Sequence, residues 1–310
     1  MLHTILGAGG VIGNELAKEL TQRGEKIRFV SRNPKNFTGV NAELHSADLL
    51  DAAAVSEAVR GSSVVYLTAG LPYKFKVWQQ NWPIVMQNAI DAAKRHNAKL
   101  IFFDNVYMYG KVNGKMTEQT PYNPTSRKGE VRARIATMLM DEVQRGNLQA
   151  SIARAADFYG PATPLSMLTS LVFDNFKKGK SAQLMLSDKF PHSFTFTPDC
   201  GVALANMAAD ATSFNQIWHL PTANPAPTGR EIVGMAAAAM DVAPKYSVLG
   251  RTMLKIIGLF VPVVGEMGEM LYQYDAPYWF DSTKFEQHFG QKPTPYTEGL
   301  QLTGAFYKNV

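Results

Sequence analysis

The sequence of 310 residues contains a single cysteine, Cys200. One cysteine cannot form an internal disulfide, and this scarcity is typical of proteins from a reducing compartment. The six histidines are scattered and form no paired spacing with the cysteine, so the sequence predicts no metal site. The first residues enter a glycine turn and lack the shape of a signal peptide, so we expect a cytoplasmic protein.

Long runs of one kind of residue are also missing. The net charge is +5 without a long stretch of Lys and Arg, which argues against a nucleic-acid partner and is compatible with an anionic cofactor or substrate. The most apolar stretch, residues 253–264, includes Lys255 and is shorter than the roughly 20 residues of a membrane-spanning helix. We expect no membrane partner, and we expect this stretch to form a buried helix or the wall of a pocket.

Short apolar runs alternate with amphipathic segments over the first half of the chain. Patterns typical of strands cover residues 3–6, 26–30, 43–46, 64–68, 99–103 and 149–154. Patterns typical of helices cover residues 11–23, 52–60, 79–96 and 125–144. This alternation predicts right-handed βαβ units and a parallel sheet covered on both faces, an α/β fold of the Rossmann type with a doubly wound sheet.

A glycine-rich turn joins the first predicted strand to the first predicted helix. Gly7, Gly10 and Gly13 permit a tight turn, close approach of a pyrophosphate and close packing of helix on strand. Val11 and Ile12 begin the helix, whose free N–H groups and partial positive charge favour phosphate oxygens. Because the motif stands between a strand and an amphipathic helix, it predicts a dinucleotide site.

The end of the second predicted strand indicates which dinucleotide binds. A site for NAD usually places Asp or Glu here, where it binds the 2′-hydroxyl of the ribose. This chain has Ser31 and Arg32 instead, and an arginine can pair with a 2′-phosphate through two hydrogen bonds. The pattern favours NADP(H) over NAD(H); the alternative is an arginine that only faces solvent.

The strand–helix alternation ends soon after the sixth strand. Proline and aromatic residues then become more frequent, and helical patterns dominate toward the C-terminus. We expect residues 1–155 to form the dinucleotide-binding domain, with a later return of the chain at about 195–222. Residues 156–194 and 223–310 are expected to form a smaller, mostly helical substrate lobe.

Several short segments recur, in this order and spacing, in one known family. They are the glycine turn, Asp48-Leu49, Thr68-Ala69-Gly70, residues 106–110 (VYMYG), residues 154–161 (RAADFYGP) and residues 192–199 (HSFTFTPD). Over nearly its whole length the chain resembles an extended short-chain dehydrogenase/reductase of the nucleoside-diphosphate-sugar epimerase/dehydratase group. The resemblance implies further cofactor contacts, namely Asp48 and Leu49 near the adenine ring, Thr68, Ala69 and Gly70 after the fourth strand, and Arg154 and Ala155 beside the nicotinamide.

The resemblance also implies where the catalytic groups belong. The family uses a Ser or Thr after the fifth strand and a Tyr-x-x-x-Lys on the next helix, and it moves a hydride between substrate and nicotinamide. The resemblance places Asn105 at the Ser position, Lys128 at the Tyr position and Arg132 at the Lys position. The standard proton-transfer set is missing, so this is an atypical member.

Two replacements for the missing groups are open. Lys128 and Arg132 lie four residues apart on one helical face, where Arg132 would favour proton loss from Lys128 and would itself hold a ribose or phosphate; the alternative is a solvated basic face. Tyr107 is the other candidate, because strand alternation would place its phenol on the side of Asn105. Its alternative is a packed aromatic.

Three functions remain open. The first is an NADP(H)-dependent oxidoreductase with a non-standard site and a small or apolar substrate, in which residues 254–280 line the pocket. The second is a nucleoside-diphosphate-sugar epimerase or dehydratase, although His192 stands where the family often binds a diphosphate with Arg. The third is a regulator that binds NADP(H) without chemistry. The retained 154–161 segment favours an enzyme with a small-molecule substrate, and a homodimer stays open.

Overall fold

The apolar runs of the first half pair into one parallel sheet in the computed structural model, which describes residues 1–309. The strand order is β11-β7-β5-β4-β1-β2-β3. The strands are β1 (Leu2–Leu6), β2 (Lys26–Ser31), β3 (Glu43–Ser46), β4 (Val64–Leu67), β5 (Lys99–Asp104), β7 (Ala150–Arg154) and β11 (Ile217–His219). The order reverses at β1 and β4, and in open sheets of this kind ligands bind at the carboxyl ends of the strands beside such a reversal.

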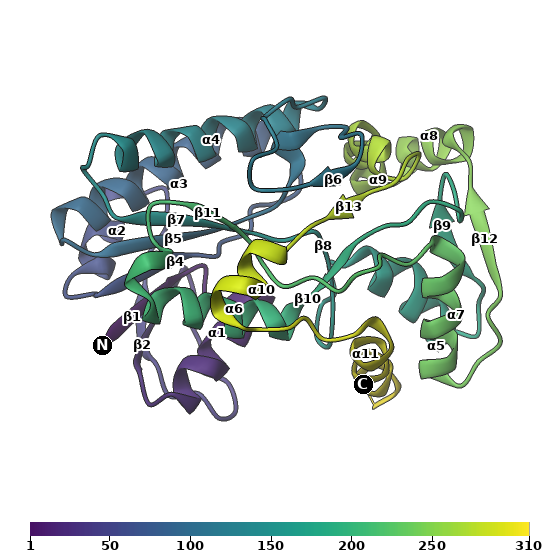
Figure 1. Ribbon diagram of the computed structural model, residues 1–310, viewed down its shortest axis with the longest axis horizontal. Coiled ribbons are helices and arrows are strands. Elements are labelled where there is room, and N and C mark those ends of the chain that lie inside the picture. The colour runs from purple at the N-terminus through teal and green to yellow at the C-terminus, as the bar shows by residue number, and fades with distance from the viewer. Residues whose placement is uncertain (310) are drawn as a thin grey trace.

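Helices cover both faces of the sheet (Figure 1). One face carries α2 (Ala52–Val59), α3 (Phe75–Arg95) and α4 (Arg127–Gln144), and the other carries α1 (Val11–Gln22), α6 (Thr197–Ala209) and α10 (Thr283–Phe289). The side chains of successive strand residues lie on opposite faces of the sheet. Tyr66 packs in the core under α1 and α6, whereas Leu67 packs in the core under α3 and α4. The period of two in the strands therefore builds two separate cores.

The remaining elements form a smaller lobe at the carboxyl side of the sheet (Figure 1). Its strands pair in twos: β8 (Asp157–Tyr159) with β10 (Phe194–Phe196), β9 (Ala182–Met185) with β12 (Tyr246–Leu249), and β6 (Lys115–Met116) with β13 (Trp279–Phe280). Its helices are α5 (Asp174–Lys177), α7 (Gly229–Met240), α8 (Arg251–Phe260), α9 (Pro262–Met267) and α11 (Tyr296–Asn309). Short helical turns are η1 (Tyr107–Tyr109), η2 (Thr169–Phe173), η3 (Ala211–Ser213) and η4 (Gly268–Gln273).

The chain crosses repeatedly between the sheet layers and this lobe. After β10 it returns to the sheet as α6 and β11, and it leaves again toward α7. Both α6 and β11 lie within residues 195–222, where the sequence predicted a return of the chain. The division of the chain into a cofactor domain and a substrate domain stays a proposal.

The apolar stretch 253–264 does not form the buried helix that the sequence predicted. It is divided between α8 and α9, and of the residues in these two helices only Leu254 is buried. Leu259 and Phe260 are each 81% exposed. The reason is that α8 packs on α9 and η4 at the margin of the lobe, where no further layer covers its outer side. Among residues 1–309, no helix has both the length and the apolar character needed to cross a membrane.

Candidate cofactor and substrate cleft

Positive φ angles and close contacts shape the glycine turn between β1 and α1. Gly7 has φ +100°, and a Cβ atom there would lie 2.4 Å from Cα of Ala69. A Cβ atom on Gly13 would lie 3.2 Å from Oγ1 of Thr68. Gly10 has more room, because its nearest neighbour would be the carbonyl oxygen of Gly7 at 3.4 Å. Gly7 and Gly13 thus set the turn and the helix packing, and Gly10 leaves space in front of α1.

The first turn of α1 is suited to an anion. Val11 and Ile12 follow Gly10, the N-cap residue, which makes no side-chain cap, and no acidic residue lies in the first turn. The leading N–H groups therefore have no side-chain partner, and the helix dipole adds a partial positive charge. These features fit the pyrophosphate of a dinucleotide.

The predicted contacts for the adenosine half of the cofactor lie at the ends of β2 and β3. Ser31 ends β2, and Arg32 is exposed immediately after it. Within residues 1–309, Arg32 forms no ion pair. The Asp48 carboxylate accepts a hydrogen bond from the Leu50 amide at 3.0 Å, and Leu49 packs against the core under α3. The guanidinium of Arg32 therefore remains free to meet a phosphate.

The contacts predicted near the nicotinamide differ in their exposure. Thr68 and Ala69 are half-buried and Gly70 is exposed, and all three follow β4 beside the glycine turn. Arg154 and Ala155 are completely buried. Neither of these two side chains has surface to offer a ligand in this structure, so their role as cofactor contacts stays a prediction.

Lys128 lies in the first turn of α4 and has no exposed side-chain surface. Its Nζ atom donates to Glu266 Oε2 at 2.5 Å, to Glu269 Oε1 at 2.9 Å and to the carbonyl oxygen of Glu266 at 2.9 Å. These bonds use all three hydrogens of an ammonium group. Lys128 could donate a proton to a substrate only if these acceptors moved away.

Arg132 is also buried and has its own carboxylate partner. Its Nε atom donates to Asp104 Oδ1 at 2.7 Å, and its guanidinium lies 4.5 Å from the ring centre of Trp82. The solvated basic face that the sequence left open is therefore wrong for Lys128 and Arg132. Because each cation has a separate carboxylate, the argument that Arg132 acts on Lys128 loses its basis.

Tyr107 does not continue the strand, as the alternation argument required. β5 ends at Asp104, and Tyr107 begins the helical turn η1. The turn forms because the Asn105 side-chain oxygen accepts a hydrogen bond from the Tyr107 amide at 3.1 Å, a local bond that competes with strand geometry. The Tyr107 ring stacks on Trp78 with centroids 6.2 Å apart, and burial raises the pKa of its phenol well above the usual value.

A second phenol, Tyr73, lies against Tyr107. Burial raises the pKa of Tyr73, while the neighbouring phenol of Tyr107 acts in the opposite direction. Nζ of Lys128 lies 4.7 Å from the centre of the Tyr73 ring, a cation–π distance. The hydroxyl oxygen of Tyr272 is buried and has no hydrogen-bond partner among residues 1–309. Three phenols therefore meet beside Lys128.

Asp157 connects this group of phenols to the substrate lobe. Its Oδ2 atom accepts hydrogen bonds from Nε2 of His192 at 2.9 Å and from the Tyr274 hydroxyl at 3.0 Å. The His192 ring is stacked between Tyr274 and Tyr278, with centroids 4.9 Å and 4.3 Å away. These contacts fix the imidazole in one orientation.

His192 borders a cavity of about 50 Å³ in the substrate lobe. Most of its wall comes from residues 167–194, and only Gln273, Tyr274 and Ala276 belong to the stretch 254–280 that the sequence proposed as the lining. The apolar side chains in the wall are Met167, Leu168, Leu171, Val172, Leu184, Met185, Phe190, Phe194, Ile232 and Ala276. The lining residues, all within the described part of the chain, include no Lys or Arg, so the cavity favours an apolar group over a diphosphate.

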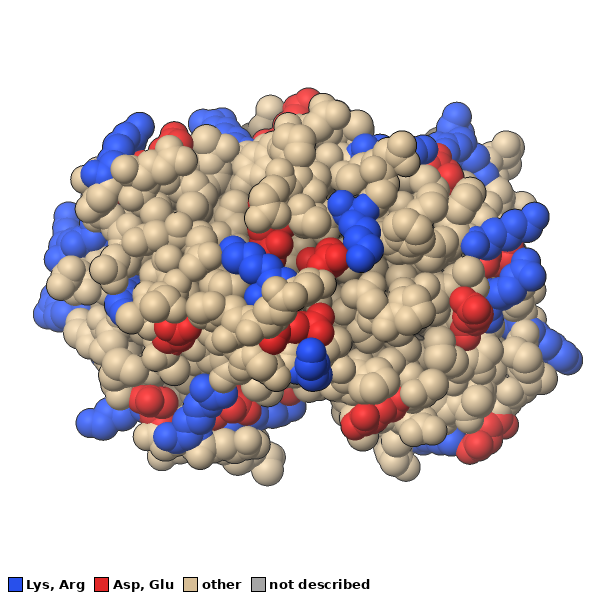
Figure 2. Space-filling model, in the orientation of Figure 1, with Lys and Arg blue, Asp and Glu red and all other residues tan. Residues whose placement is uncertain are grey.

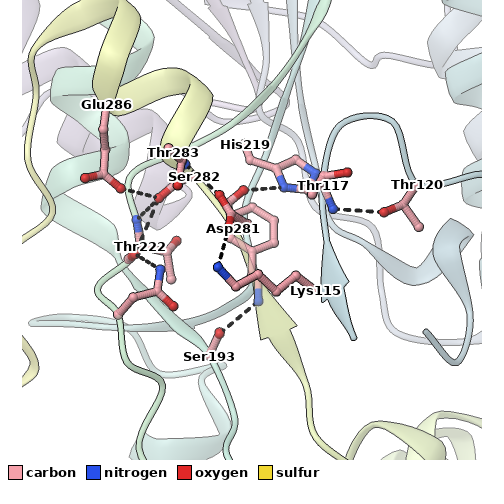
Figure 3. A network of polar contacts seen from close by, with 12 residues as sticks. Lys115, Thr117, Thr120, Ser193, His219, Thr222, Asp281, Ser282, Thr283 and Glu286 are labelled. Atoms are coloured by element: carbon pink, nitrogen blue, oxygen red, sulfur yellow. Dashed lines mark hydrogen bonds and ion pairs between the residues drawn. The ribbon is translucent and has the colours of Figure 1, made fainter. Parts of the chain in front are cut away.

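A polar network fixes the segments that cross between sheet and lobe (Figure 3). Nδ1 of His219 donates to the Asp281 carbonyl oxygen at 2.9 Å, and Nζ of Lys115 donates to the Asp281 carboxylate at 3.0 Å. With Nδ1 as the donor, Nε2 of His219 accepts from the Tyr109 hydroxyl at 2.8 Å. Burial lowers the pKa of His219 to about 3. This neutral imidazole is part of the scaffold under the cleft.

Sequence reasoning did not identify the carboxylates that hold Lys128, or Asp157. Glu266 and Glu269 stand three residues apart just after the apolar stretch, and that spacing on one helical side was the only local signal. Asp157 lies inside the 154–161 segment, but nothing in the segment indicates its partners. Their contacts with Lys128 and His192 arise between segments far apart in the chain.

Comparison with protein families gives one broad match. The model of the NAD dependent epimerase/dehydratase family matches residues 3–215. Among curated relatives, the uncharacterized protein y4nG of Sinorhizobium fredii is 22% identical over 216 residues, which cover 67% of this chain and 54% of that protein. The dTDP-glucose 4,6-dehydratase of Mycolicibacterium smegmatis is 22% identical over 179 residues, which cover 54% of each. The chain thus spans about half the length of these curated relatives.

Solved structures share the fold over their full length. MoeE5 in complex with UDP-glucuronic acid and NAD has a TM-score of 0.81 at 19% identity, covering 100% of this chain and 99% of that chain. The Thermus thermophilus UDP-glucose 4-epimerase complex with NAD has a TM-score of 0.80 at 18% identity, covering 100% of each. The Bacillus anthracis dTDP-glucose 4,6-dehydratase with NAD has a TM-score of 0.82 at 17% identity, covering 100% and 97%.

Proposed function

The chain belongs to the NAD dependent epimerase/dehydratase family of extended short-chain dehydrogenases/reductases, and from that premise we propose that it is an NADP(H)-dependent reductase of small or apolar carbonyl compounds. The single observation that carries this proposal is the half-buried Tyr107 beside Tyr73 and Lys128. It stands close to the positions where the family's own acid and its lysine are replaced. Hydride transfer as the family performs it then needs a different proton donor. Another phenol is the closest chemical substitute for the missing catalytic tyrosine.

The state of Tyr107 favours reduction over oxidation. Burial raises the pKa of the Tyr107 phenol, so it carries its proton at neutral pH and can give it only to a strong base, such as the alkoxide that forms when a carbonyl carbon receives a hydride. NADPH, when bound, supplies a hydride to the carbonyl carbon. Tyr107 gives its proton to the carbonyl oxygen, and the neighbouring hydroxyl of Tyr73 would supply the proton that replaces it.

Neighbouring residues support this role. The backbone amide of Asn105 donates to Asp104 Oδ1 at 2.8 Å, and its side-chain oxygen accepts from the Tyr107 amide, whereas its side-chain nitrogen Nδ2 has no partner within residues 1–309. It can therefore donate to a carbonyl oxygen, as the family's Ser does. Lys128 fixes the Tyr73 ring from one side. The apolar cavity beside His192 would accept the carbon skeleton of the substrate.

Cofactor choice is the second part of the proposal. Gly7, Gly10, Val11, Ile12 and Gly13 would hold the pyrophosphate, and Arg32 would pair with a 2′-phosphate. The solved neighbours are complexes with NAD. The preference for NADP(H) proposed here depends on the exposed, unpaired guanidinium of Arg32.

The proposal is tested by measuring how fast wild type and Tyr107→Phe reduce a panel of small aldehydes and ketones. With NADPH oxidation followed by absorbance, wild type should reduce at least one small aldehyde or ketone, and Tyr107→Phe should lower kcat by ~100-fold while NADPH binding is kept. The matched control is Tyr246→Phe, which removes a phenol from β12 outside the cleft. Equal losses in both variants would refute Tyr107 as the donor.

A non-catalytic regulator is the second candidate function, and one observation favours it. Both residues at the family's catalytic helix positions, Lys128 and Arg132, are held by carboxylates. Such a protein would bind NADPH and turn over no member of the panel. Titration of NADPH together with the turnover assay therefore separates the two functions.

A further inference from the structure

Helices α8 and α9 form a hairpin, residues 251–267, with an exposed apolar tip. Leu259 and Phe260 are each 81% exposed. Four further apolar side chains of the hairpin are between 41% and 51% exposed, namely Met253, Ile256, Val261 and Val263. Single exposed apolar residues are common, but a group of six on 17 successive residues indicates an interaction surface.

The tip is held rigidly, because the two helices touch through their backbones. A Cβ atom on Gly258 would lie 3.0 Å from Cα of Gly265, so the helices pack as closely as glycine permits. Pro262 starts α9, and its fixed φ angle favours the sharp turn after α8. The bulky residues Leu259 and Phe260 therefore project at the turn itself.

Unpaired positive charge lies on the hairpin and at its base. Lys255 lies on α8, and Lys74 and Lys76 flank Phe75, whose amide donates to Glu266 of the hairpin at 2.9 Å. Within residues 1–309 these three lysines form no ion pair. Blue side chains lie beside tan surface at the end of the molecule that carries α8 (Figure 2).

The acidic residues nearby are already neutralised. Glu266 and Glu269 pair with Lys128, and Glu269 also lies 3.7 Å from Nε of Arg127, so two carboxylates face two cations. Asp275 pairs with both Lys111 and Arg251. The charge left free around the tip is therefore positive. Its electrostatic complement is an anionic surface.

We propose that this hairpin docks on an anionic membrane surface, with Leu259 and Phe260 among the acyl chains and the lysines against the headgroup phosphates. Apolar side chains with flanking lysines on a short helix are typical of interfacial binding. The hairpin is too short to span the bilayer. A second copy of the chain is a poorer occupant, because it would bring the same unpaired lysines face to face. Since the base of the hairpin holds Lys128, docking also brings the cleft close to the bilayer.

Vesicle co-sedimentation of the full chain tests the docking surface. We use vesicles of phosphatidylcholine alone and of phosphatidylcholine with an equal amount of phosphatidylserine. Wild type should sediment with the mixed vesicles at low salt and should be released as salt rises. The double variant Leu259→Glu/Phe260→Glu should bind at least ~10-fold more weakly, because it places two carboxylates where apolar contact is needed.

Two further variants make the test specific. Lys255→Glu should weaken binding to the mixed vesicles by ~5-fold or more, the effect of losing one basic residue near an anionic leaflet. Leu302→Glu is the matched control, since Leu302 is 50% exposed on α11, and it should bind as wild type does. Thermal unfolding by circular dichroism checks that each variant is folded.

Several results would overturn the proposal. It fails if wild type does not bind the mixed vesicles at low salt, or if the double variant binds as well as wild type. It also fails if wild type does not bind vesicles but forms a dimer by light scattering, and the double variant is a monomer. The tip would then be a self-association surface. Sedimentation requires neither cofactor nor turnover, so these results are independent of the proposed reductase activity.

Discussion

Nζ of Lys128 lies 2.5 Å from Oε2 of Glu266, so the residue that we predicted at the family's catalytic tyrosine position is bound by a carboxylate from the hairpin of the smaller lobe. The same carboxylate accepts the amide of Phe75 at 2.9 Å. One side chain thus joins α9 to the start of both α3 and α4. It explains why α3 begins at Phe75, four residues before the sequence pattern predicted a helix.

This ion pair should contribute measurably to stability. We expect Glu266→Gln to lower the free energy of unfolding by about 2 kcal/mol, because it leaves the buried ammonium of Lys128 with one carboxylate fewer. In a double-mutant cycle with Lys128→Met, the coupling energy should be at least ~1 kcal/mol. Denaturant unfolding measures both. The exposed pair Glu57–Arg60 is the control and should show no measurable coupling; additive effects at Glu266 and Lys128 would mean that the contact contributes nothing.

Cofactor selectivity should depend on Arg32. Fluorescence titration should show tighter binding of NADPH than of NADH, and Arg32→Ala should reduce the NADPH affinity by ~10-fold or more, because a bidentate contact to the 2′-phosphate is lost. NADH affinity should hardly change. Arg134→Ala removes another exposed arginine, from the middle of α4, and should leave both affinities intact. Equal affinity of wild type for the two cofactors would reject the assignment.

A substitution at Gly10 should affect cofactor binding without affecting folding, unlike a substitution at Gly13. We expect Gly10→Val to fold, because the nearest atom to its new Cβ lies at 3.4 Å, and to lose dinucleotide binding by blocking the front of α1. Gly13→Val should destabilise the protein as well, because its Cβ would lie 3.2 Å from Ile5 and Thr68.

Gly250→Val is a matched control for Gly10→Val, since Gly250 is the N-cap residue of α8 with a similar backbone conformation and open space around it. This variant should keep dinucleotide binding. If folded Gly10→Val still bound NADPH with wild-type affinity, the phosphates would have to lie elsewhere.

His219 should make the protein sensitive to acid. Burial lowers its pKa from 6.5 to about 3 in the folded state, so between these values the unfolded chain binds a proton that the folded chain does not. Stability therefore falls as the pH decreases through this window. Between pH 7.5 and 5 the loss from this residue should be about 2 kcal/mol.

The measurement is the free energy of unfolding of wild type and His219→Gln at several pH values. The variant starts from lower stability because it disturbs the contacts to Tyr109 and Asp281, but its decline toward pH 5 should be less steep by that amount. His45→Gln, on the partly exposed strand β3, is the matched control. Parallel curves for wild type and His219→Gln would exclude this histidine as the cause.

The sequence alone predicted the α/β class, the order of the first strands and helices, and the glycine turn. These features depend on short-range patterns. Alternating apolar residues specify the strands, and the small residues at 7 and 13 are needed because Ala69 and Thr68 lie against them. The family resemblance was likewise readable, because it depends on the order of local segments.

Only the tertiary structure decided what the charged and aromatic residues do. Nothing local distinguishes Lys128, which is buried against a carboxylate 138 residues away, from Arg127 beside it, which is exposed. The apolar stretch 253–264 has the composition of a core helix, yet Phe260 faces solvent. Ion pairing and burial depend on which distant segments meet when the chain closes, and one segment's pattern does not specify its partners.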